Sequence, residues 1–114
     1  MTKSEIIESV STGGIPLYKY GEACWALTRH QALIALRKLK PTKVGVVGGD
    51  MYQLVEGKLE PNGDSWYFAK RHKESDEAYS RRTIDGTRRY ILMYENFGVD
   101  DTYFTLILEG VKNC

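Results

Sequence analysis

The sequence has few of the features that mark membrane, secreted or strongly charged proteins. Its longest apolar runs are four or five residues, whereas a membrane-spanning helix needs about 20, so we expect no membrane span. Acidic residues near the N-terminus interrupt any apolar stretch of the kind that a secretory signal requires. Two cysteines, Cys24 and Cys114, are too few for a disulfide framework. We therefore expect both thiols to be reduced and the protein to be cytoplasmic.

The sequence also has no large excess of positive or negative charge. The 16 Lys and Arg residues are nearly balanced by 15 Asp and Glu residues, which leaves a formal net charge of +1. A protein that binds nucleic acid or an anionic membrane usually carries a clear excess of positive charge. We therefore expect neither a membrane nor a nucleic acid as the partner.

What is present is the ordinary composition of one globular domain. The 114 residues are 42% hydrophobic and 27% charged, and a chain of this length has room for one hydrophobic core. We expect a single domain over residues 1–114. No repeat, linker or low-complexity tract interrupts it.

Three segments have the pattern of helices. Apolar residues at helical spacing predict a short helix over residues 4–10. Thr28 and Gln31 form a potential capping box for a second helix, which Pro41 ends. A third helix begins after Ser75 and reaches Phe97, with Gly98 as its stop. Its interior Gly86 predicts the close approach of a neighbouring group, because glycine otherwise costs about 1 kcal/mol in a helix.

The strand signals lie mainly between the second and third helices. Residues 44–47 and 50–56 are predicted strands separated by a bend at Gly48–Gly49, and a turn at residues 56–57 leads into a returning strand. A second turn at residues 61–64 precedes an aromatic strand at 65–69. Residues 103–111 alternate like a last strand, whereas residues 15–26 follow no period and are expected to be irregular.

This order of segments predicts an α+β fold. We expect an antiparallel sheet of about four strands, consisting of a meander and the C-terminal strand. Two main helices should cover one face of the sheet, and a short N-terminal helix should accompany them.

Enzymatic chemistry has little support in the residues. Cys24 would need His30 or His72 as a base to become a nucleophile, but no known cysteine signature surrounds it and core packing is the favoured interpretation. The two histidines are 42 positions apart, and no pair of close metal ligands exists. We expect no catalytic residue, no metal and no cofactor.

The main alternative is a small module for single-stranded nucleic acid. Residues 66–68 are Trp, Tyr and Phe, and residues 70–73 are Lys, Arg, His and Lys. Rings beside cations can stack and hold single strands. However, Glu74, Asp76 and Glu77 follow at once, and the balanced charge of the whole chain favours a different function.

Four tracts together resemble a known family through their order and spacing. They are residues 25–28 (WALT), 46–52 (VVGGDMY), 57–61 (GKLEP) and 64–67 (DSWY). In this order they are similar to the immunity protein 40 family of bacterial polymorphic toxin systems, and the similarity continues into the last strand. Met51 and Asn62–Gly63 depart from the family pattern, which more often has a small β-branched residue and other turn residues there.

The resemblance implies a small cytoplasmic antidote that is not an enzyme. It would bind the C-terminal toxin domain of a polymorphic or contact-dependent inhibition toxin, in a 1:1 complex, and block the active site sterically. Aromatic residues and arginines are the usual anchors of such interfaces. The candidate toxin-binding residues are Tyr52, Asp64, Trp66, Tyr67, Arg81, Arg82 and Arg88. For Tyr52 and Trp66, packing in the core is the favoured alternative.

Overall fold

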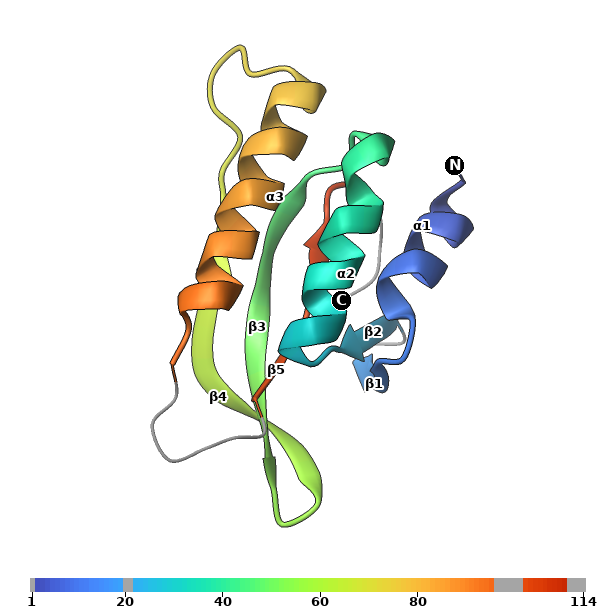
Figure 1. The fold of residues 1–114 in the computed structure, drawn as a ribbon, viewed down its shortest axis with the longest axis vertical. Helices are drawn as coiled ribbons and strands as arrows, with labels where there is room; N and C mark the ends of the chain where they lie inside the picture. The colour runs from blue at the N-terminus through green and yellow to red at the C-terminus, as the bar shows by residue number, and fades with distance from the viewer. Residues whose placement is uncertain (1, 20–21, 96–101, 111–114) are drawn as a thin grey trace.

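A computed structural model of the protein describes residues 2–19, 22–95 and 102–110. The chain begins with a helix and a β-hairpin, continues through a second helix and a long hairpin, and closes with a third helix and two short strands (Figure 1). In order, the elements are α1 (Lys3–Ser11), β1 (Ile15–Lys19), β2 (Glu22–Ala26), α2 (Arg29–Leu39), the 3-10 turn η1 (Lys40–Thr42), β3 (Val46–Val55), β4 (Lys58–Tyr67), α3 (Asp76–Met93), β5 (Thr102–Phe104) and β6 (Ile107–Leu108).

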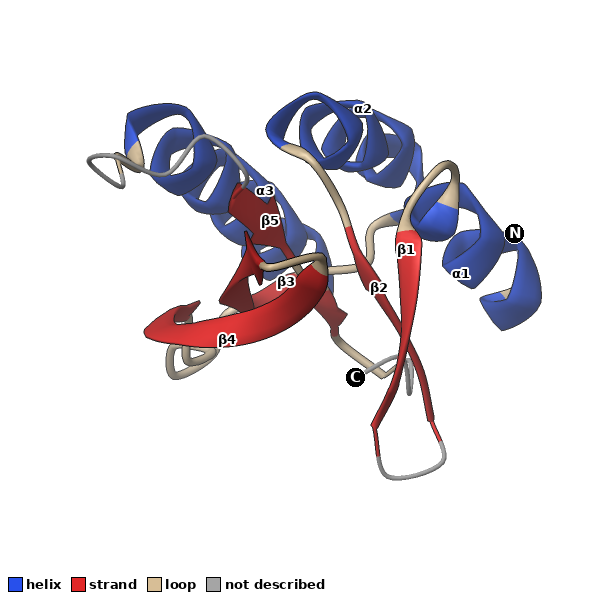
Figure 2. Ribbon diagram, turned by 90° about the horizontal axis from the view of Figure 1, so that it is seen from below, coloured by secondary structure: helices blue, strands red, loops and turns tan. Residues whose placement is uncertain are grey.

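The main sheet has four strands, and β3 is at its centre. β3 pairs antiparallel with β4 on one side and with β5 and β6 on the other. Helices α2 and α3 lie on the same face of this sheet, and the smaller β1–β2 hairpin stands beside it (Figure 2). The predicted α+β class, the antiparallel four-stranded sheet, the two main helices and the short N-terminal helix are confirmed.

The central hairpin differs from the prediction because its strands are longer. β3 runs without interruption through Gly48 and Gly49, which were predicted to form a bend. The glycines are needed for close packing instead: a Cβ on Gly49 would lie 2.0 Å from the carbonyl oxygen of Thr105. The turn predicted at residues 61–64 is also wrong, since β4 continues through it and Pro61 pairs with Tyr52. Between the pairs Asp50–Ser65 and Tyr52–Pro61 the register shifts, because β4 has two more residues there than β3.

Three other segments depart from the prediction. Residues 15–26 were expected to be irregular, but they form the β1–β2 hairpin, in which Leu17 pairs with Cys24. The last predicted strand is divided into β5 and β6, because the backbone between them turns to bond β3: Thr105 donates its N–H to the Asp50 carbonyl at 3.0 Å. Helix α3 ends at Met93, before the predicted stop. Residues 97 and 98, predicted as its end, lie outside the described residues.

The helix starts are as predicted, because they depend on local chemistry. Thr28 accepts the Gln31 backbone N–H at 3.2 Å, and the Gln31 side chain accepts the Thr28 N–H at 3.0 Å. Ser75 caps α3 by accepting the Ala78 N–H at 3.1 Å. The close neighbour predicted for Gly86 is the Phe68 ring, which would lie 2.5 Å from an added Cβ.

The core fills the space between the sheet and the helices. Its fully buried members include Leu36 from α2, Met51 from β3, Ile91 from α3 and Phe104 from β5. Arg29 adds a polar link between the two main helices: its guanidinium donates to the carbonyl oxygens of Ile91 and Leu92 at the end of α3, and to that of Tyr94 at 2.9 Å. The start of α2 is therefore bound to the end of α3, which sets the spacing between the two helices.

Candidate partner-binding surface

Trp66 and Tyr52 are buried, so the structure places both in the interior rather than on an open surface. Their exposed fractions are 8% and 7%. The Trp66 ring stacks on Tyr90 with ring centroids 4.7 Å apart, and its indole N–H donates to Thr87 Oγ1 at 3.0 Å. Tyr52 lies in β3 opposite Tyr103 of β5. Tyr52 and Trp66 are therefore packed in the core, which was the alternative that the sequence favoured.

Asp64 is exposed, but its carboxylate is engaged. It accepts a hydrogen bond from the Tyr94 hydroxyl at 2.6 Å, and that hydroxyl accepts one from the Asn62 side-chain amide at 2.9 Å. Burial of the ring, and then the carboxylate that its hydroxyl bonds, raise the pKa of Tyr94 above its ordinary value. Asp64 therefore links β4 to the end of α3 and still faces solvent.

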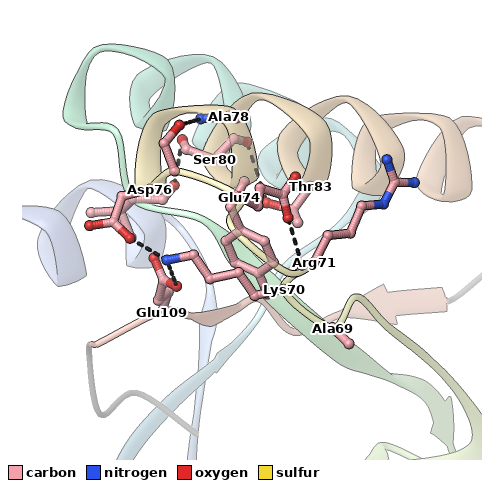
Figure 3. Close-up of polar contacts among 12 residues, drawn as sticks. Ala69, Lys70, Arg71, Glu74, Asp76, Ala78, Ser80, Thr83 and Glu109 are labelled. Atoms are coloured by element: carbon pink, nitrogen blue, oxygen red, sulfur yellow. Dashed lines mark hydrogen bonds and ion pairs between the residues drawn. The ribbon is translucent and has the colours of Figure 1, made fainter.

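Arg82 is held within the fold by an ion pair. Its guanidinium donates to both carboxylate oxygens of Glu74, at 2.8 and 2.7 Å, and to the Ala69 carbonyl at 2.8 Å. The hydrogen bonds from Arg82 are the main cause that lowers the pKa of Glu74 to about 2. The backbone N–H of Arg71, which donates to the Glu74 carboxylate at 3.0 Å, also lowers this pKa (Figure 3). The arginine also lies over the ring of Tyr79, 5.6 Å from its centroid. Its hydrogen-bonding capacity is largely used inside this chain.

A second ionic contact beside it closes the loop before α3. Lys70 lies between the carboxylates of Asp76 and Glu109, and the Glu109 carboxylate is 3.5 Å away (Figure 3). The hydrogen bond to Asp76 is the main cause of a raised pKa for Lys70. Lys70 and Arg82 were part of charge runs in the sequence, and only the fold shows that they have partners.

The remaining candidates are open to solvent. Tyr67 is 71% exposed at the end of β4, next to the buried Trp66. Arg81 is exposed and lies 3.5 Å from the Glu77 carboxylate one helical turn earlier, and Arg88 is exposed on the same helix. The seven candidates thus do not form one patch. Tyr67 and Asp64 lie on β4, and Arg81 and Arg88 lie on α3.

Two grooves border α3, and sequence reasoning found neither. On the β4 side, a largely apolar hollow of about 480 Å³ is lined by rings and by the exposed Met93. On the α2 side, a groove lined by Arg88 and Arg81 also contains cations from the end of α2 and from η1. Those cations, Arg37 and Lys40, could be read from the sequence only as favourable charges near a helix end.

The structure describes the environments of the residues that were considered for catalysis and for metal binding. Within residues 2–19, 22–95 and 102–110, no group of three or more His, Cys, Asp or Glu side chains could hold a metal ion. His30 and His72 are both exposed. Cys24 is 3% exposed and disulfide-bonded, so the expectation that it is reduced is wrong, and no thiolate is available there. Cys114, also expected to be reduced, lies outside the described residues.

The three rings that were considered for stacking on nucleic-acid bases are not all exposed. Of the three consecutive rings at residues 66–68, only Tyr67 is exposed, while Trp66 is buried and Phe68 is half-buried.

Across the described parts of the chain, no helix is both long and apolar enough to cross a membrane.

The family comparison decides the classification. The family model described as Immunity protein 40 matches residues 16–108, which is most of the chain. The chain belongs to the immunity protein 40 family. Neither a curated protein nor a solved structure matched the sequence. Membership of the immunity protein 40 family supports an immunity role, in which the partner is a toxin.

The match also delimits which parts of the fold the family shares. It begins within β1 and ends at the last residue of β6, so it contains both sheets and the two main helices. Helix α1 precedes the matched region. The residues that line both grooves beside α3 lie within the matched range.

Proposed function

We propose that this protein is the antidote of a bacterial polymorphic or contact-dependent inhibition toxin, and that it neutralises the C-terminal toxin domain by binding it in a 1:1 complex. The match to the immunity protein 40 family over residues 16–108 carries this proposal. The toxin domain would be the product of a neighbouring gene. The antidote performs no chemistry of its own.

Steric occlusion is the mechanism that the structure supports best. A surface that buries about 800 Å² per partner is enough for a specific complex, and binding costs less when that surface is already formed. The Arg29 link between α2 and α3 and the stacked rings under β4 hold such a surface in place. The toxin would then lose access to its substrate because the antidote covers the active site.

Exposed candidates are the proposed points of contact. Tyr67 offers an open aromatic ring, and Arg81 and Arg88 offer cations with few internal bonds. Asp64 adds a solvent-facing carboxylate on the same strand as Tyr67. Tyr52, Trp66 and Arg82, which were proposed with them, support this surface from inside the fold in our proposal.

Co-expression tests the function directly. Cells that express the neighbouring toxin domain should survive when this protein is present and die when it is replaced by an immunity protein of another family. The purified pair should elute from size exclusion as one 1:1 complex, and the toxin's activity should fall in proportion to the amount of complex. Death despite a well-expressed antidote would contradict the proposal.

The proposed compartment is the cytoplasm, where a toxin with an intracellular target would act. The disulfide at Cys24 is the observation that favours an oxidising compartment instead. Cell fractionation together with labelling of free thiols distinguishes the two. Recovery from the cytoplasm with labelled cysteines supports the proposal, whereas periplasmic recovery with protected cysteines overturns it.

A further inference from the structure

The groove between α2 and α3 is built from two adjoining hollows. One, of about 330 Å³, lies between the two helices, and the other, of about 400 Å³, lies at the η1 end. Lys40 and Asp85 line both hollows, so the two form one continuous feature. We call it the α2–α3 groove. Figure 1 shows the two helices side by side along its length.

The floor of the groove is apolar. Leu36 and Ile84 are buried there at 1% and 2% exposure, and the half-buried Leu33 lies beside them. These side chains belong to the core or pack against it, so the floor cannot move without disturbing the fold. A partner side chain that reaches the floor would therefore meet a fixed apolar surface.

The walls of the groove carry a clear excess of positive charge. Two carboxylates, Glu77 and Asp85, face five cations. The cations are Arg37, Lys40, Lys43, Arg81 and Arg88. This balance of +3 is larger than the net charge of +1 for the whole chain. Positive charge is therefore concentrated in the groove, which the nearly neutral composition of the whole chain does not indicate.

Internal ion pairs account for only part of this charge. Glu77 lies 3.9 Å from Lys43 and 3.5 Å from Arg81. Among the described residues, no carboxylate lies within 4.0 Å of the cationic groups of Arg37, Lys40 or Arg88. Arg82, the residue after Arg81 on the same helix, differs from these cations because it donates to both carboxylate oxygens of Glu74.

The dipole of α2 explains some of these cations but not their convergence. Arg37 and Lys40 lie at the C-terminal end of α2, where the macrodipole favours positive charge. Arg88 lies in α3 before its last turn, and Lys43 follows η1. No helix end favours a cation at Arg88. Cations from separate elements meet around one apolar floor, which is the pattern of a recognition surface for an acidic partner.

We propose that the α2–α3 groove binds an acidic segment of the toxin domain. This inference rests on the proposed antidote function and adds the chemistry of the contact. The segment presents an apolar side chain to the Leu33–Leu36–Ile84 floor, and flanking Asp or Glu carboxylates bond the guanidinium groups of Arg37 and Arg88. Arginine suits this role because its planar donors match a carboxylate in pairs. Complementary charge also speeds association and selects the cognate toxin.

Adjacent arginines provide a matched experiment. Arg88 lines the α2–α3 groove, whereas Arg89 lines the hollow on the other side of α3, and both are exposed. Arg88→Glu and Arg89→Glu therefore make the same charge change on the same helix. The affinity of each variant for the purified toxin domain is measured by calorimetry at low and at moderate salt. Thermal unfolding of each free variant verifies that it folds.

The proposal predicts a clear difference between the two variants. Arg88→Glu should weaken toxin binding about tenfold or more, as a lost interface anchor does, while Arg89→Glu should change it less than about threefold. Binding by the unaltered protein should weaken with salt, and Arg88→Glu should reduce that salt dependence because one screened attraction is gone. Adding Arg37→Glu to Arg88→Glu should weaken binding further.

Other outcomes separate the possible failures. If the unaltered protein binds the toxin and both variants bind equally well, the groove inference fails and the antidote function stands. A larger loss for Arg89→Glu moves the contact to the β4 side of α3 and overturns the inference. If the unaltered protein binds a single-stranded oligonucleotide in place of the toxin, and Arg88→Glu abolishes this, both the groove inference and the proposed function fail.

Discussion

The two sides of α3 differ in what their side chains do. On the side facing β4, Trp66 stacks on Tyr90, Arg82 is paired with Glu74, and Phe68 packs against Gly86. On the side facing α2, exposed cations stand above an apolar floor, and several of them have no carboxylate partner among the described residues. Paired and stacked side chains therefore lie on one side of the helix, and exposed cations lie on the other.

The difference teaches how to interpret pairs of like residues in a sequence. Arg81 and Arg82 are neighbours, yet Arg82 is bound to Glu74 and Arg81 is 73% exposed at its side chain. Successive positions on a helix point in directions about 100° apart. Two adjacent arginines on α3 therefore face different surroundings: Arg82 is held inside the fold, whereas Arg81 has only an exposed ion pair with Glu77.

The largest loss of stability is expected from a substitution on the side of α3 that faces β4. Trp66→Ala should lower the free energy of unfolding by about 3–5 kcal/mol, because it removes a buried aromatic side chain and leaves a cavity. Urea denaturation measures the change. Tyr67→Ala, next along the chain but 71% exposed, is the control and should change stability by less than about 0.5 kcal/mol. Equal losses from the two variants would contradict the assignment of Trp66 to the core.

A smaller loss should follow from one hydrogen bond on the same side. Thr87→Val keeps the shape of the side chain but leaves the Trp66 indole N–H without its acceptor, which costs about 1–3 kcal/mol for a buried group. Urea denaturation measures this loss. In a Trp66→Phe background no indole N–H remains, so the same substitution should then be nearly neutral. An unchanged cost in that background would show that the hydrogen bond is not the cause.

The Glu74–Arg82 pair should make stability depend on pH. The pKa of Glu74 is about 2 in the folded protein and 4.5 ordinarily, so its contribution is complete above about pH 4.5 and is lost as the pH falls toward 2. Glu74→Gln should therefore be less stable than the unaltered protein at pH 7, and the gap should narrow between pH 4.5 and 2. Urea midpoints across this range measure the gap. A constant gap would exclude the ion pair as its source.

The smallest effect on stability is expected on the groove side. Arg81→Ala and Arg88→Ala should each change the free energy of unfolding by less than about 0.5 kcal/mol, because exposed ion pairs and solvated cations contribute little. The same denaturation measurement applies. If either variant loses as much stability as Trp66→Ala, the contrast between the two sides of α3 is not valid. If the variants keep their stability but bind the toxin more weakly, the contrast between the two sides of α3 is supported.

Local chemistry made part of the fold predictable. The capping boxes and caps involve residues three positions apart, so Thr28, Gln31 and Ser75 could be assigned from the sequence, and the structure confirms them. Gly86 could be predicted to meet a close neighbour, because glycine in a helix needs a reason. The identity of that neighbour, Phe68, depended on how β4 and α3 pack.

Long-range packing decided what the sequence pattern left open or indicated wrongly. Gly48–Gly49 and residues 61–64 have the composition of turns, but both lie inside strands. Gly48, Gly49 and Pro61 pair across the hairpin, whereas residues 62–64 form an irregularity within β4. The candidate site was affected in the same way. Whether an aromatic residue or an arginine is exposed depends on what the rest of the chain places against it, and this separated Tyr67 from Trp66 and Arg81 from Arg82.

By itself, the sequence determined the α+β class, the positions of the helix starts and the resemblance to an immunity protein family, because these depend on neighbouring residues and on the order of motifs. Only the tertiary structure decided where charge accumulates. Cations from α2, η1 and α3 meet in one groove although they are up to 51 positions apart in the chain. Electrostatic interactions depend on distance in space, and the nearly neutral composition contains no record of that arrangement.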